Sequence, residues 1–97
     1  MANRERRPKV QIMAEILKLC REPQLKTHVM QQTNLSWELL EKYLHNLESQ
    51  GFLQTQIQRG SVKYLTTQKG HLLLTKWNDV MDLILPYDKK EKSASVR

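Results

Sequence analysis

Residues 26–66 have the sequence KTHVMQQTNLSWELLEKYLHNLESQGFLQTQIQRGSVKYLT, and this stretch determines the predicted fold. It begins with two short helices, expected over Leu25–Gln32 and from Ser36 onward, with a tight turn at residues 33–34. Ser36 is a good N-cap because its hydroxyl can accept a hydrogen bond from the first helical turn. Apolar side chains at helical spacing predict the buried stripe of this second helix: Leu40, Tyr43, Leu44 and Leu47, with Leu39 at its edge.

A β-hairpin is predicted directly after these helices. Gly51 is placed to end the preceding helix in a left-handed conformation. The segments Phe52–Ile57 and Val62–Thr66 are rich in β-branched and aromatic side chains, as strands are. The four residues between them, Gln58-Arg59-Gly60-Ser61, supply the turn.

One further helix is expected on each side of this stretch. Pro8 suits a first helical turn, and Pro23 ends a helix whose apolar positions are Ile12, Met13, Ile16, Leu17, Leu19 and Cys20. Thr67 is a suitable N-cap for a last helix to about Leu85, where Pro86 blocks continuation. The order helix, helix, helix, hairpin, helix predicts a mainly α fold with a small β-hairpin (α+β), which is a winged helix-turn-helix. Its last helix is apolar on two sides and is therefore the expected C-terminal dimerisation helix.

The expected organisation has four parts: a flexible basic arm over 1–7, the winged helix-turn-helix domain over 8–66, the C-terminal dimerisation helix over 67–86, and a disordered basic tail over 87–97.

The composition excludes several classes of function. The chain has 97 residues, one domain's worth, and no apolar run approaching the ~20 residues of a membrane span. Its charged N-terminus is not a secretory signal, and a lone cysteine, Cys20, fits a reducing cytosol. Three widely spaced glycines rule out a phosphate-cradling loop, so no cofactor is expected. The three histidines are far apart and the paired carboxylates fit solvated helix faces, so neither a metal nor an enzymatic activity is expected.

The net charge of +6 is concentrated at the two ends. Residues 1–9 contribute +3 and residues 88–97 contribute +2, which leaves +1 for the 78 residues between them. Such tails attract any polyanion and would give salt-sensitive affinity that is independent of sequence. Solubilising ends are the alternative.

Several stretches resemble small archaeal winged helix-turn-helix proteins: KTHVM (26–30), NLS (34–36), LEKYL (40–44), GFL (51–53) and YLTTQKG (64–70). The likeness covers about residues 10–85. That family includes predicted transcription regulators and abundant chromatin proteins that dimerise through a C-terminal coiled-coil helix. The resemblance therefore implies a DNA-binding homodimer. The chain departs from the family pattern at His28, where a basic residue is common, and in a shorter, less heptad-regular last helix.

The helix after Ser36 is the candidate recognition helix, because such helices lie in the major groove with N-terminal residues at base edges. Its outward side chains are Ser36, Trp37, Glu38, Glu41, Lys42 and His45. Glu38 and Glu41 would repel phosphates, although each can pair with a residue four positions later or accept from a cytosine amine. Trp37 could contact a thymine methyl or fold back on the preceding helix, and the second arrangement is favoured. An ordinary solvated helix face is the alternative for the whole set.

The remaining candidate DNA contacts lie outside this helix. Arg59, Ser61 and Lys63 belong to the hairpin, where an arginine can enter a narrow minor groove. Backbone contacts are expected from the first helix of the pair, through Lys26, Thr27, His28 and Gln31, and non-specific contacts from the arm, through Arg4, Arg6, Arg7 and Lys9.

The last helix carries an apolar seam expected to form a homodimer: Leu73, Trp77, Val80, Met81 and Ile84. Packing of both of its apolar sides within one chain is the alternative. The combined expectation is a homodimeric transcription regulator that binds double-stranded DNA in the cytoplasm, associated with the nucleoid. A general chromatin protein or a winged-helix module for protein–protein contacts would share the same pattern.

Overall fold

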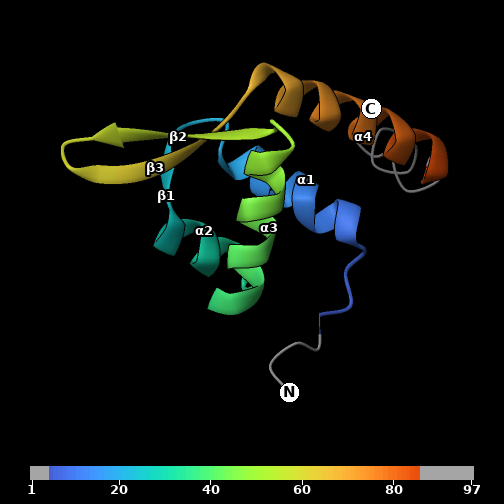
Figure 1. The fold of residues 1–97 in the computed structure, drawn as a ribbon. Coiled ribbons are helices and arrows are strands. Elements are labelled where there is room, and N and C mark those ends of the chain that lie inside the picture. The colour runs from blue at the N-terminus through green and yellow to red at the C-terminus, as the bar shows by residue number, and fades with distance from the viewer. Residues whose placement is uncertain (1–4, 86–97) are drawn as a thin grey trace, which may run out of the picture.

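The computed structural model describes residues 5–85 of the chain. Its elements follow the predicted order with one addition: α1 (Lys9–Leu19), β1 (Gln24–Leu25), α2 (Lys26–Thr33), α3 (Trp37–Ser49), β2 (Leu53–Gln58), β3 (Ser61–Thr66) and α4 (Gln68–Ile84) (Figure 1). Four helices with a three-stranded antiparallel sheet make an α+β winged-helix fold, as predicted. The expected C-terminal tail, residues 87–97, lies outside the described residues.

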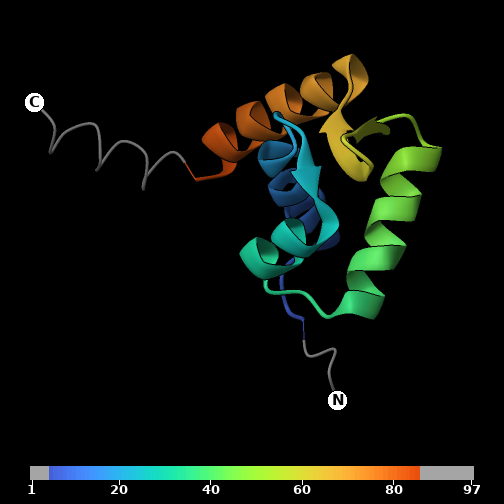
Figure 2. The ribbon, with the colours of Figure 1, turned by 90° about the vertical axis from the view of Figure 1, so that its left-hand side faces the viewer.

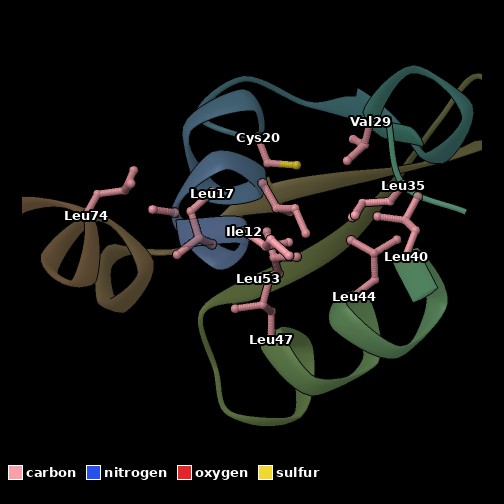
Figure 3. Close-up of a cluster of buried hydrophobic side chains, with 12 residues drawn as sticks. Ile12, Leu17, Cys20, Val29, Leu35, Leu40, Leu44, Leu47, Leu53 and Leu74 are labelled. Atoms are coloured by element: carbon pink, nitrogen blue, oxygen red, sulfur yellow. The ribbon is translucent and has the colours of Figure 1, made fainter. Parts of the chain in front are cut away.

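The core is built around α1, which packs against α2, α4 and β3 (Figure 2). Ile12 and Leu17 of α1 are buried in one apolar cluster with Leu40 and Leu47 of α3 (Figure 3). Two hydrogen bonds from Thr66 fix the end of β3 to α1: its backbone N–H donates to the Cys20 carbonyl at 2.7 Å, and its hydroxyl donates to the Leu17 carbonyl at 2.7 Å. The helices and the sheet therefore share one core.

The sequence did not predict β1. Gln24 and Leu25 pair antiparallel with Tyr64 and Lys63 of β3, so α2 begins one residue later than expected, at Lys26. Leu25 accordingly lies in a strand and remains 42% exposed. A two-residue strand has no periodicity of its own, and the strand exists because β3 offers it an edge.

The hairpin forms as predicted, but its turn is two residues shorter than the four expected, because Gln58 and Ser61 belong to the strands. Gln58 pairs with Ser61, which leaves Arg59 and Gly60 as the two turn residues, with φ of 52° and 79°. Positive φ at both central positions is the type I′ arrangement, which matches the twist of the flanking strands. Figure 1 shows this wing projecting away from α1 and α4.

The end of α3 is joined to the start of α4. Gly51 has φ of 87° and ends α3 as predicted, with Phe52 N–H donating to the Leu47 carbonyl at 2.8 Å. Thr67 caps α4 as predicted by accepting from Gly70 N–H at 3.1 Å, and its hydroxyl donates to the Gly51 carbonyl at 2.6 Å. Lys69 donates to the Gln50 carbonyl at 2.7 Å. These contacts give the TTQKG stretch (residues 66–70) a physical role, which is to fix α4 against the C-terminus of α3.

No helix within residues 5–85 is long and apolar enough to cross a membrane.

Candidate nucleic-acid interface

α3 presents one exposed face along its length. The Ser36 hydroxyl accepts from Leu39 N–H at 3.1 Å and so sets the first turn. Burial of Leu40, Leu44 and Leu47 turns the opposite face to solvent, with Tyr43 and Leu39 half-buried at its borders. The predicted outward side chains that are exposed are Trp37, Glu38, Glu41, Lys42 and His45.

Lys26, in the first turn of α2, connects α2 to this face. Its ammonium lies 2.5 Å from a Glu41 carboxylate oxygen and 4.8 Å from the centre of the Trp37 ring. The hydrogen bond to Glu41 raises the pKa of Lys26, so the ammonium stays charged at neutral pH. Glu41 is thus paired with Lys26. The pairing with His45 that the i, i+4 spacing allowed is not the one observed. Trp37 remains 46% exposed, with the Lys26 ammonium over its ring. It therefore contacts α2, as the favoured arrangement expected, but keeps half of its surface open to solvent.

The charge of α3 differs from that of the wing. The helix carries Glu38, Glu41 and Glu48 against Lys42. From Ser49 to Asn78 the sequence has no acidic residue at all, and this stretch includes Arg59 and Lys63 of the hairpin and Lys69 and Lys76 of α4. The wing therefore carries two cations, Arg59 and Lys63, and no carboxylate. The signal in the sequence is the absence of acidic residues over 49–78. It is lost when the net charge of the whole central region is compared with that of the two ends.

The wing and α2 are adjacent through β1. Lys63 is paired with Leu25, the residue before Lys26, and a shallow groove is lined by Leu25, Gln58, Arg59, Ser61 and Lys63. Arg59 and Ser61 are exposed at the tip, and Lys63 is half-buried lower on the hairpin. On α2, the side chains of Thr27, His28 and Gln31 are exposed as the interface expectation requires. The structure thus brings candidate residues of α2, α3 and the wing onto neighbouring surfaces.

The N-terminal arm is placed differently from the expectation. Arg4 lies outside the described residues, and Arg6 is exposed. Arg7, however, is held by the folded domain: its guanidinium donates to Glu5 at 2.6 and 2.7 Å, to the Thr33 carbonyl at 2.8 Å, and to Glu15. Its side-chain hydrogen bond lowers the pKa of Glu5 to about 2. Arg7 therefore fastens residues 5–7 to α1 and to the end of α2, and it is not a free cation on a flexible arm.

The predicted seam of α4 is divided between two environments. Leu73 and Trp77 pack against the core, and Met81 is half-buried beside α1. Val80 and Ile84 are 42% and 61% exposed, and further exposed apolar side chains of this helix and its cap are Leu72, Leu83 and Leu85. The inner part of the seam is thus used within the chain, and the outer part is open.

Two chemical functions, a reactive cysteine and a metal site, are not supported by the described residues. Burial raises the pKa of the Cys20 thiol to about 12, so this cysteine is an inert core residue. Within residues 5–85, no group of three His, Cys, Asp or Glu side chains could hold a metal ion.

The chain is similar to one family and to several known proteins. A winged helix-turn-helix family model matches residues 6–85. An uncharacterized protein of Methanocaldococcus jannaschii is 37% identical over 82 residues, which cover 84% of this chain and 37% of that relative, so the chain spans about a third of its length. The crystal structure of Sso10a-2, a DNA-binding protein from Sulfolobus solfataricus, superimposes with a TM-score of 0.74 at 27% identity over 93% of this chain and 96% of that one. A mutant of ZitR from Lactococcus lactis matches with a TM-score of 0.57 at 14% identity, over 95% of this chain and 75% of that one, which supports the fold alone.

Proposed function

The chain belongs to the winged helix-turn-helix family, and we propose that it binds double-stranded DNA, with α3 in the major groove and the β2–β3 wing on the adjacent backbone or minor groove. The similarity to Sso10a-2, whose own description is DNA-binding, supports this proposal. The observation that carries it is the exposed face of α3 beside a wing that has two cations and no acidic residue.

The proposed division of labour follows the charges. Arg59, Ser61 and Lys63 bind phosphates or the minor groove, and they supply most of the affinity. Lys42 and His45 of α3 reach base edges or phosphates, and Glu38 accepts from a cytosine amine. Lys26 neutralises Glu41 on this face. Thr27, His28 and Gln31 of α2 contact the backbone, as the first helix of such pairs does.

We further propose that the protein is a homodimeric transcription regulator of the cytoplasm, associated with the nucleoid. The exposed side chains of Val80 and Ile84 support a second copy packing along α4. A two-fold dimer would present two recognition helices to a palindromic site. The expected dimerisation helix over 67–86 and winged domain over 8–66 are the parts that this proposal uses.

A different class of function, a protein–protein module, is favoured by one observation, which is the excess of carboxylates on α3. A general chromatin protein would bind DNA through the same residues without preference for sequence. Salt dependence distinguishes the protein–protein module from a DNA-binding protein. An apolar interface keeps its affinity as salt rises, whereas an interface with phosphates loses it.

Replacing Arg59 with alanine is expected to weaken binding to every duplex and to reduce the slope of log K against log salt by about one. The measurement is a fluorescence-anisotropy titration of a labelled random-sequence duplex across a salt series. Arg59→Asn is the matched variant, since asparagine tolerates the left-handed turn conformation that Arg59 adopts. Asn should lose affinity as Ala does while the hairpin keeps its turn. Slopes unchanged in both variants would remove Arg59 from the interface.

A further inference from the structure

The wing has one polar face and one face that becomes progressively more exposed toward its tip. Paired residues of adjacent strands share a face, so Leu53 and Thr66 at the base lie on the same side as Ile57 and Val62 near the tip. Leu53 and Thr66 are buried, at 2% and 4% exposed. Ile57 and Val62 stand directly opposite each other and are 75% and 49% exposed.

The other face of the wing shows no such apolar pair. Alternation places Gln54, Gln56, Gln58, Ser61 and Lys63 there, together with Leu65, which is half-buried at the base of the wing opposite Gln54. The exposed apolar pair is therefore confined to the side on which Tyr64 packs against the core, one cross-strand pair before the turn. Among residues 5–85 the pair therefore stays largely open to solvent at Ile57 and half open at Val62.

The turn next to this pair holds an arginine in an unusual conformation. Arg59 has φ of 52°, where glycine or asparagine would fit with less strain, and its side chain is exposed. The hairpin has a cation at its tip, an apolar pair behind it and no acidic residue. This arrangement suits a surface that is negatively charged at its edges and has apolar walls within. The minor groove of DNA is such a surface, because phosphates line its edges and deoxyribose C–H groups form its sides.

A two-stranded ribbon, with strands about 4.8 Å apart, does not fit into an undistorted minor groove about 6 Å wide. Apolar wedges in known minor-groove proteins enter by prising base steps apart, which kinks the duplex. Pyrimidine–purine steps deform most readily, whereas A-tracts are stiff and narrow. The deformability of the DNA thus decides whether Ile57 and Val62 can follow Arg59 into the minor groove.

We propose that Ile57 and Val62 form a minor-groove wedge, which enters behind Arg59 at deformable pyrimidine–purine steps and bends the duplex. This inference rests on the proposed DNA binding and adds the class of sequence and the deformation. It gives the wing a role in choosing sites by the flexibility of DNA.

The test compares two duplexes of equal length and base composition, one with central alternating TA steps and one with an A-tract, each carrying a fluorescent donor and acceptor at its ends. The full-length chain is expected to bind the TA duplex about tenfold more tightly and to shorten its end-to-end distance. The variant Ile57→Thr/Val62→Thr keeps two β-branched residues in the strands and should lose both the preference and the bend. The variant Gln54→Thr/Gln56→Thr, on the opposite face and outside the groove beside Arg59, should keep both.

Each other outcome counts against a defined claim. Equal affinity for the two duplexes with no bend would overturn the wedge and leave DNA binding intact. A threonine variant that still prefers and bends the TA duplex would overturn it as well. A chain that binds neither duplex would refute the proposed function itself. If the threonine variant changes only the sedimentation of the free protein, the pair is a protein contact and the wedge is wrong.

Discussion

Replacing Gly70 with alanine is expected to lower the free energy of unfolding by about 2–3 kcal/mol. A Cβ at this position would lie 2.4 Å from the Phe52 carbonyl oxygen and 2.5 Å from Cγ2 of Thr66. Neither neighbour can move freely. The Phe52 carbonyl accepts from Thr67 N–H at 3.0 Å, and Thr66 is held to α1 by its two hydrogen bonds. The steric cost therefore exceeds the ~1 kcal/mol that alanine gains over glycine in helix propensity.

Thermal unfolding followed by circular dichroism measures this effect. A loss of about 2–3 kcal/mol lowers the Tm of a domain of this size by roughly 10–20 °C. Asn78→Ala is the matched control, since Asn78 is exposed on the same helix and its replacement is expected to change stability by less than about 0.5 kcal/mol. If Gly70→Ala were as stable as the unaltered chain, α4 would not approach the start of β2 as closely as described.

The second large effect concerns association. Val80→Lys combined with Ile84→Lys is expected to weaken the proposed dimer by at least about 100-fold, because like charges placed opposite each other cost several kcal/mol. Both side chains are exposed in the single chain, so the fold should be unaffected. A two-fold axis doubles the penalty, since each copy brings both lysines to the same interface.

Sedimentation equilibrium over a range of protein concentrations follows this change. Asn78→Lys adds a charge to α4 away from the seam and should leave association unchanged. An unaltered chain that sediments as a monomer throughout would reject the dimer. A double-lysine variant that associates as strongly as the unaltered chain would reject the outer seam of α4 as its interface.

The parts of the fold that were predictable depend on chemistry close in sequence. The caps at Ser36 and Thr67 and the left-handed glycine at position 51 are local signals, and all three occur as expected. β1 was missed because its two residues become a strand only through pairing with β3, about 40 positions along the chain. The place of the wing turn was predictable because Gly60 lies between two β-rich segments, although the turn is the two residues Arg59 and Gly60 and not the four expected.

The candidate interface was less accessible to sequence reasoning. The predicted outward face of α3 is exposed, but its main tertiary contact, Lys26 with Glu41, joins residues 15 positions apart. Arg7 was misassigned to a free arm because its carbonyl partner, Thr33, is 26 positions away. A basic side chain near a terminus has the same sequence signature whether it meets a carboxylate of its own chain or a phosphate. Only the packed structure distinguishes these two fates.

The most direct test of DNA binding by the folded domain is a salt series with a random-sequence duplex, comparing the full chain with a chain of residues 5–87. This shortened chain, with Arg6→Ala added, keeps Arg7 and its partners while it removes the other cations of residues 1–7 and those of residues 88–97. The expected result is that it still binds, with a slope of log K against log salt steeper than about −2, as several phosphate contacts require. Binding that disappears with the ends would contradict the proposal. The tails alone would then hold DNA, and the winged domain would be a module for protein contacts.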